Sequence, residues 1–165
     1  MTLDRLKSFG LKASDSRTEV AGPDNIAQLE ARIGASLPVA YRNFLLQTGG
    51  GCFASQGLIF KAGPHQSTMD TFYGWDSNES LDFLGVMGIY EGRISPDYLV
   101  IGNDGMSNQI LLGLRGDEEG KIFYWDCEDE EYEDMDYRGN IHMIASGFEE
   151  FIDGLKVEDW SEEIL

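Results

Sequence analysis

The stretch from Asn25 to Phe53, NIAQLEARIGASLPVAYRNFLLQTGGGCF, constrains the fold more than any other part of the chain. Its first part carries one apolar stripe at the helical positions i, i+3 and i+7, formed by Ile26, Leu29 and Ile33. Gly34 is expected to end this helix, because glycine readily adopts the left-handed conformation found at helix C-termini. Asp24 or Asn25 is the candidate N-cap, since either side chain can accept a hydrogen bond from an unpaired backbone N–H.

A second helix is predicted directly after the first. Pro38 opens it, because a proline at a helix start loses no hydrogen bond that it would otherwise make. One face of this helix carries Tyr41, Phe44, Leu45 and Thr48. The triplet Gly49–Gly51 ends it and lets the backbone reverse. The stretch therefore predicts two short helices that pack against a sheet.

The motifs of this stretch resemble the opening motif of the SUKH superfamily through Ile33-Gly34, Leu37-Pro38, Tyr41-Arg42-x-Phe44-Leu45 and Gly49-Gly50-Gly51. A second block agrees with the family downstream, at Tyr98–Gly102 with Asp104-Gly105 and then at Lys121–Asp126. The resemblance covers most of residues 25–128. It departs from the family at the triple glycine, where an asparagine more often precedes two glycines, and the Lys61–Leu81 stretch matches little.

This resemblance implies a non-enzymatic binding module. The superfamily contains bacterial immunity proteins, viral proteins and a yeast regulator of cell-wall synthesis. Many bacterial members neutralise a cognate polymorphic or contact-dependent toxin, often a nuclease. A regulatory adaptor in a signalling or cell-wall pathway is the alternative that the yeast relative suggests.

The remainder of the chain predicts an α+β fold. Short apolar runs between turn-rich segments predict strands at Phe53–Phe60, Thr68–Trp75, Tyr98–Gly102, Gln109–Leu114 and Lys121–Cys127. Apolar stripes predict helices at Glu79–Tyr90 and Ala145–Leu155. We expect a single antiparallel sheet with helices packed mainly on one face. Because Tyr98–Gly102 carries apolar residues at both odd and even positions, another element should cover the second face of the sheet.

Length and composition indicate one SUKH-like domain over residues 1–165, with an N-terminal arm or helix at 1–22. No apolar run approaches the ~20 residues of a membrane span, and the N-terminus is too charged for a secretory signal. We therefore expect a cytoplasmic protein, as a monomer or a homodimer. Cys52 and Cys127 form no disulfide framework and are expected as free thiols, although one bond between them stays open.

The net charge of the chain limits the kinds of partner that it can bind. Thirty acidic residues against twelve basic ones give a net charge of −18. This balance disfavours nucleic acid and anionic membranes, because phosphate binding needs a basic surface. It favours a basic protein partner, reached quickly by long-range attraction. Solubility alone is the competing interpretation.

The negative charge is densest in the predicted acidic loop, residues 126–138. Eight carboxylates lie between Asp126 and Asp136, but no register gives the glycine and glutamate spacing of a calcium loop. A solvated loop, weak divalent-metal binding and a docking surface for a basic protein are the three interpretations. The partner-binding candidates, with the tyrosines as contact anchors, are Asp126, Glu128, Asp129, Glu130, Glu131, Tyr132, Glu133, Asp134 and Tyr137.

The sequence contains no recognisable catalytic set. A small hydrolase with paired carboxylates would first implicate Asp70, Asp76 and Asp104, which lie beside aromatic or glycine-rich turns. His65 and His142 show no metal-ligand spacing, and no nucleotide-binding loop is present. We therefore expect no cofactor and no metal.

Overall fold

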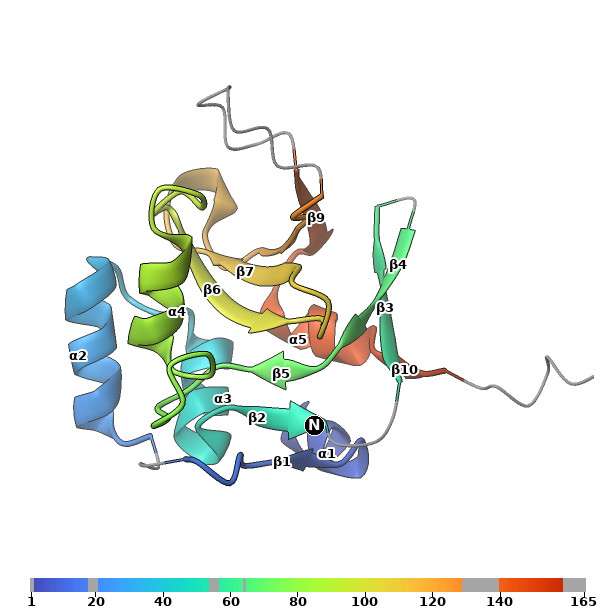
Figure 1. Cartoon of the computed structure of the whole chain (residues 1–165), viewed down its shortest axis with the longest axis horizontal. Coiled ribbons are helices and arrows are strands. Elements are labelled where there is room, and N and C mark those ends of the chain that lie inside the picture. The colour runs from blue at the N-terminus through green and yellow to red at the C-terminus, as the bar shows by residue number, and fades with distance from the viewer. Residues whose placement is uncertain (1, 18–20, 54–56, 64, 129–139, 159–165) are drawn as a thin grey trace, which may run out of the picture.

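The computed structural model describes residues 2–17, 21–53, 57–63, 65–128 and 140–158 (Figure 1). The order of elements is α1 (Thr2–Ser8), β1 (Leu11–Lys12), α2 (Pro23–Ile33), α3 (Val39–Thr48), β2 (Gly51–Phe53), β3 (Leu58–Ala62), β4 (His65–Met69), β5 (Thr71–Phe72), α4 (Phe83–Tyr90), β6 (Tyr98–Asn103), β7 (Gln109–Gly113), the 3₁₀ turn η1 (Gly116–Glu118), β8 (Ile122–Trp125), β9 (Ile141–Ala145), α5 (Phe148–Asp153) and β10 (Lys156–Val157).

The strands form a large sheet and a small one. The large sheet has seven antiparallel strands in the order β1-β2-β5-β6-β7-β8-β9. The small sheet has three antiparallel strands in the order β10-β3-β4. The predicted α+β fold with a large antiparallel sheet is thus confirmed, and the small sheet is an addition to the single sheet that we expected.

One break in the sequence accounts for the second sheet. The run Thr68–Trp75, predicted as one strand, is divided at Asp70 between β4 and β5. On one side of this break β4 pairs with β3, and on the other β5 pairs with β2 and β6. The chain therefore leaves the small sheet and enters the large one within three residues.

The face of the large sheet that carries Phe72 packs against α3 and α5. Phe44 of α3 meets the Phe72 ring at 4.9 Å and the Phe148 ring of α5 at 5.0 Å, between centroids. On the same face, Phe60 of β3 meets Tyr124 of β8 at 5.9 Å. Edge-to-face aromatic contacts of this kind add to the stabilisation from burial alone.

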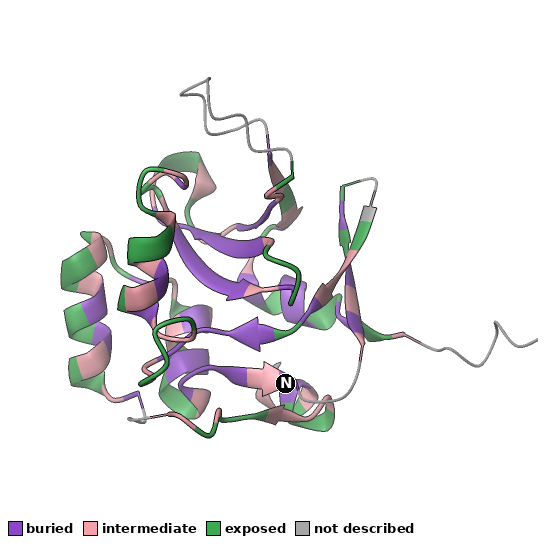
Figure 2. Ribbon diagram, in the orientation of Figure 1, coloured by how far each residue is buried: buried purple, intermediate pink, exposed green. Residues whose placement is uncertain are grey.

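The opposite face is covered by α4. Tyr90 at the end of α4 contacts Trp125 of β8 at a centroid distance of 5.5 Å, and Trp125 is 1% exposed. Because successive side chains of a strand point to opposite faces, Tyr124 and Trp125 face the two different covers. Trp125 is therefore a core residue, and the burial of successive residues in β6 and β7 reflects this double cover (Figure 2).

The helical pair forms as predicted, with one change at its start. Gly34 adopts φ 66° and its N–H donates to the Glu30 carbonyl at 2.9 Å, which ends α2. The N-cap, however, is Gly22 rather than Asp24 or Asn25, because Pro23 occupies the first turn. The Asn25 side chain instead accepts a hydrogen bond from the Gly22 N–H at 2.9 Å.

Two other predicted helices are shorter than expected. Asp82 is the N-cap of α4 and accepts hydrogen bonds from the Leu84 and Gly85 N–H groups, so the helix begins four residues after Glu79. The predicted helix Ala145–Leu155 contains the end of β9 and then α5. The predicted strand Phe53–Phe60 likewise corresponds to the end of β2 and the start of β3.

Candidate partner-binding surface

The acidic run begins where β8 ends, on a base that is fixed by hydrogen bonds. The Asp126 N–H donates to the Asn140 carbonyl at 3.0 Å, and the Asn140 side-chain amide donates to the Asp126 carbonyl at 2.9 Å. The Asp126 carboxylate accepts from the Glu128 N–H at 2.9 Å. Asp126 is half-buried and Glu128 is exposed, so Glu128 presents its full charge to solvent.

The other predicted binding residues lie outside the described part of the chain. They are Asp129, Glu130, Glu131, Tyr132, Glu133, Asp134 and Tyr137. Their assignment as a docking surface stays a prediction. Of the predicted binding residues, the structure describes Asp126 and Glu128.

A buried carboxylate supports the base of the acidic run. Asp104, in the β6–β7 turn, is 3% exposed. It accepts hydrogen bonds from the Met106 N–H at 2.8 Å and the Asn108 N–H at 3.2 Å. Its second oxygen accepts from the Asn108 amide and the Ser67 hydroxyl, each at 2.8 Å, and from the Tyr124 hydroxyl at 3.2 Å.

Asn108 connects this hydrogen-bond network to the start of the acidic run. Its side-chain oxygen accepts the Cys127 N–H at 3.0 Å while its amide donates to Asp104. Ser67, which also bonds Asp104, comes from β4 of the small sheet. One carboxylate therefore joins the small sheet, the large sheet and the start of the acidic run.

These contacts argue against acid–base catalysis at Asp104. A general acid or base needs access to substrate, whereas the Asp104 oxygens are buried and surrounded by donors. Asp70 is exposed and accepts the Thr71 hydroxyl at 2.7 Å, whereas Asp76 lines a small cavity whose lining includes neither Asp70 nor Asp104. The structure brings no pair of these three carboxyls together in a cleft among the described residues.

The pKa of the Asp76 carboxyl is shifted downward, whereas that of a general acid is raised. Burial acts to raise the pKa of its carboxyl, but the hydroxyls of Ser14 and Ser16, the Asn78 N–H and the nearby Arg17 outweigh it and hold the pKa below its usual range. The carboxyl is therefore ionised at neutral pH.

The two cysteines are free thiols, as expected. Burial, the negative charges of Asp126 and Glu128, and that of Asp104 raise the pKa of Cys127. The thiol is therefore a poor nucleophile at neutral pH, because the thiolate is the reactive form. Among the described residues no group of three or more His, Cys, Asp or Glu side chains could hold a metal ion.

A groove of about 290 Å³ lies over β6, between α4 and the end of α2. Its apolar lining includes Ile33, Met87, Tyr90, Ile94 and Tyr98. Half-buried Trp75 packs edge-on against Phe83 at 5.3 Å and lines the small cavity that also contains Asp76.

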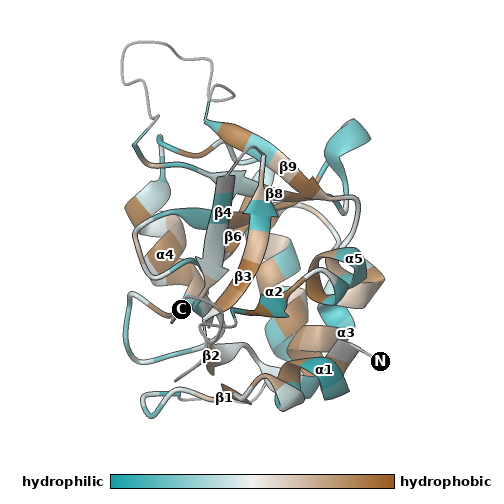
Figure 3. Cartoon of the chain, turned by 90° about the vertical axis from the view of Figure 1, so that its right-hand side faces the viewer, coloured by the Kyte–Doolittle hydropathy of each residue, from teal (hydrophilic) through white to brown (hydrophobic). Residues whose placement is uncertain are grey.

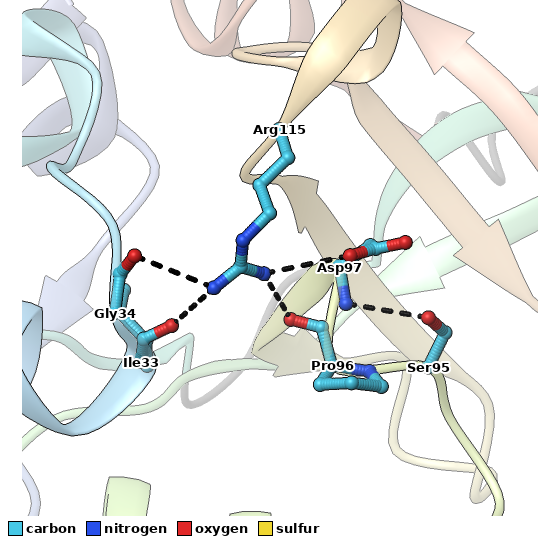
Figure 4. Close-up of polar contacts among 6 residues, drawn as sticks. All are labelled: Ile33, Gly34, Ser95, Pro96, Asp97 and Arg115. Carbon is cyan, nitrogen blue, oxygen red and sulfur yellow. Dashed lines mark hydrogen bonds and ion pairs between the residues drawn. The ribbon is translucent and has the colours of Figure 1, made fainter.

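Arg115 lies between Ile33 and Pro96, two residues that line this groove (Figure 4). Its guanidinium donates to the carbonyls of Ile33 at 2.5 Å and Gly34 at 3.5 Å, and to that of Pro96 at 2.7 Å. A cation at a helix C-terminus is favourable, because unpaired carbonyls and the helix dipole concentrate negative charge there. Arg115 thus ties α2 to the turn before β6.

A second groove, of about 500 Å³, lies beside β9. It is lined by Ile59, Phe60, Lys61 and Gln66 of the small sheet, by Ile144 of β9 and by Glu150, Phe151, Gly154 and Lys156 around α5. Its walls come from both sheets and from the C-terminal helix.

The fold and the two helical motifs agree with one family model over residues 21–154, that of the SMI1 / KNR4 family (SUKH-1). The chain belongs to this family. The resemblance drawn from the motifs is thereby confirmed, and the match includes both the helical pair and the strands that carry Asp104 and Trp125.

Two individual proteins are similar to this family member. The SPbeta prophage-derived uncharacterized protein YokK of Bacillus subtilis (strain 168) is 25% identical over 165 residues, which cover 90% of this chain and 81% of YokK. A crystal structure of a protein from Pseudomonas syringae pv. tomato superimposes with a TM-score of 0.50 at 14% identity, over 76% of this chain and 81% of that one. The second likeness supports the fold.

Several features of this surface were not predicted. Asp104 was considered as a hydrolase carboxyl and Asp104-Gly105 as part of the family motif, but the hydrogen bonds between Asp104 and Asn108 were not predicted. Arg115 carried no signal, because its partners are backbone carbonyls far away in sequence. No described helix has the length and apolar content needed to cross a membrane.

Proposed function

We propose that this protein is an immunity protein that binds and neutralises a cognate bacterial toxin. Members of its family are generally non-enzymatic immunity or regulatory proteins, and the similarity to a prophage-derived protein fits a toxin-immunity role. The observation that carries the proposal is the combination of this family membership with eight carboxylates placed directly after β8. The chain acts in the cytoplasm, without catalysis and without a cofactor.

The partner in this proposal is a basic toxin domain, of the nuclease type. A nuclease carries a basic groove for the phosphate backbone, and a carboxylate-rich segment offers that groove a similar density of negative charge. Asp126, Glu128 and the following acidic residues attract the toxin over long range, and Tyr132 and Tyr137 supply apolar contact area. Blocking at or beside the toxin's active site is then sufficient for neutralisation.

The first experiment captures the partner with tagged protein from the native cells and tests the products of neighbouring genes. A single basic protein that is toxic when expressed alone, and harmless when co-expressed with this chain, is the expected result. Recovery of signalling or cell-wall enzymes instead would replace immunity by the regulatory adaptor.

The second experiment localises the binding surface. Glu128, Glu130, Glu131 and Glu133 are changed together to Lys, and a matched control changes the exposed residues Asp15, Glu79, Asp117 and Glu119 to Lys. Both variants alter the net charge equally. We expect the first to slow association with the captured toxin by about 10-fold or more at low salt and to reduce its salt dependence, because steering depends on local charge. Equal rates in both variants would reject the acidic run as the binding surface.

A further inference from the structure

Within the described residues, no strand pairs with the outer edge of β9. β9 is the last strand of the large sheet and pairs on one side with β8. The opposite edge of the same sheet, β1, has two residues, whereas β9 has five. An exposed edge strand presents a row of unpaired N–H and C=O groups that can accept another strand. β9 is therefore the longest free edge of the seven-stranded sheet (Figure 3).

The register identifies which backbone groups point outward. The Asp126 N–H bonds the Asn140 carbonyl, so Asn140 directs its carbonyl toward β8. In an antiparallel ladder the backbone N–H and C=O groups of successive residues point alternately toward and away from the paired strand. Those of His142 therefore point toward β8, and those of Ile141 and Met143 point away from it. Within the described residues, Ile141 and Met143 make no backbone hydrogen bond on that outer side.

Two of the usual protections of an edge strand, lysine and proline, are missing from β9. Its sequence, IHMIA, contains neither lysine nor proline, and Met143 is 55% exposed. Natural edge strands are commonly shielded by such residues or by a covering element. The β8–β9 register shifts between the pairs Phe123–Met143 and Ile122–Ala145, so the regular part of the edge is 141–143 and it ends at an irregularity at Ile144. The 500 Å³ groove continues from Ile144 and can receive side chains of an added strand.

Charge around β9 selects the kind of strand. Asp126 and Glu128 precede it, and Glu149 and Glu150 follow within five residues of its end. The groove is lined by the apolar residues Ile59, Phe60, Ile144 and Phe151 and also contains Lys61 and Lys156, so it favours apolar side chains over basic ones. A second copy of this chain is a poor occupant, because two molecules of net charge −18 repel each other.

We propose that β9 takes up an extended, basic segment of the partner protein as an eighth strand of the large sheet. Backbone hydrogen bonds to Ile141 and Met143 provide the pairing, and the flanking carboxylates select the basic residues. This inference rests on the proposed function in taking the partner to be a basic toxin. It adds a defined docking edge to the acidic run.

A peptide tests the edge without the toxin. The ¹⁵N-labelled full chain is titrated with a ten-residue peptide of alternating lysine and valine, and in parallel with its glutamate–valine counterpart. We expect amide hydrogen exchange of Ile141 and Met143 to slow by about 10-fold with the basic peptide, because pairing protects the outward N–H groups. The acidic peptide should leave both rates unchanged.

Two variants separate backbone pairing from side-chain contact. Met143→Pro removes an outward N–H and leaves the bonds to β8 in place, since proline is tolerated at such edge positions. Met143→Ala keeps the N–H and removes the side chain. Loss of peptide binding in Met143→Pro and its retention in Met143→Ala is the expected result. If Met143→Pro fails to fold by circular dichroism, a peptide with alternate N-methylated residues gives the same comparison from the ligand side.

Three results would overturn the proposal. They are unchanged exchange at Ile141 and Met143 up to millimolar basic peptide, equal protection by the acidic peptide, or protection that grows with protein concentration alone, which means pairing of two copies. Failure of toxin neutralisation with peptide pairing intact would reject the immunity function and keep the edge. The reverse outcome would keep the function and place binding on the acidic run alone.

Discussion

Replacing Asp104 is the sharpest test of how the acidic run is held. In Asp104→Ala, five hydrogen bonds to a buried carboxylate are lost at once. A hydrogen bond to a charged group contributes roughly 1.5–3 kcal/mol, and buried donors left without partners add to the loss. Because such bonds are not additive and the Ser67 and Tyr124 hydroxyls can rotate, we expect a loss of about 4 kcal/mol in the free energy of unfolding.

Asp104→Asn gives a finer version of the same test. The amide oxygen keeps the two backbone donors, Met106 N–H and Asn108 N–H, while the new NH₂ group faces the NH₂ group of Asn108. Asn108 cannot flip without losing the Cys127 N–H. The bond from the Asn108 amide is lost, and its NH₂ group is opposed to the new one. We therefore expect a loss of about 2 kcal/mol in the free energy of unfolding and faster hydrogen exchange of the Cys127 amide.

Urea unfolding followed by circular dichroism measures these losses, with the slope of the transition compared between variants. Asp97→Ala is the control, because its exposed carboxylate lies 3.6 Å from Arg115 and such a pair contributes roughly 0–1 kcal/mol. A loss below about 1 kcal/mol in Asp104→Ala would refute the view that this carboxylate holds the two sheets and the run together.

Three further predictions use other described contacts. Arg115→Ala should lower the free energy of unfolding by about 1–2 kcal/mol and Arg115→Lys should restore little of it, because only the planar guanidinium reaches carbonyls on both sides; thermal unfolding of both variants measures this. The Leu37 N–H, with Arg42, holds the pKa of Glu30 below its usual 4.5 against the effect of burial. The ionised Glu30 carboxylate therefore stabilises the fold above pH 4.5, and this contribution is lost as the pH falls through the lowered pKa. In urea titrations, the difference in unfolding free energy between wild type and Glu30→Gln should shrink from pH 5 to pH 3. A constant difference would contradict this. Cys127 should alkylate more slowly with iodoacetamide at pH 7.5 than a cysteine in a short peptide, and Asp126→Asn should quicken it, as mass spectrometry would show; equal rates would contradict the raised thiol pKa.

The helical pair and the central strands could be predicted because their signals are local. An apolar stripe, a glycine at the C-terminus and a proline at the start depend on neighbours within one turn, and α2 and α3 follow them closely. The cap at Gly22 was missed because Pro23 occupies the first turn, so the helix starts two or three residues earlier than the predicted caps, which the apolar stripe does not indicate.

Strand pairing could not be predicted from the same signals. Residues 141–144 were assigned to no element and Ala145 to a helix, because IHMIA is a short apolar run without strict alternation and it precedes a true helical stripe. The division of Thr68–Trp75 at Asp70 depends on partners in β3 and β6, which are distant in sequence. For the same reason the acidic run was visible in the sequence, whereas the Asp104 support and the open edge of β9 were not.

The fixed base of the acidic run has a consequence for how such a protein can diversify. The Asp126–Asn140 pair and the Asn108 contact to Cys127 hold both ends of the intervening segment independently of its own residues. Lengthening a loop whose ends are already fixed is inexpensive, at about 0.6 kcal/mol for each doubling. Under the proposed docking role of this segment, its substitution, insertion or exchange would change partner choice while selection on the folded scaffold stays nearly constant.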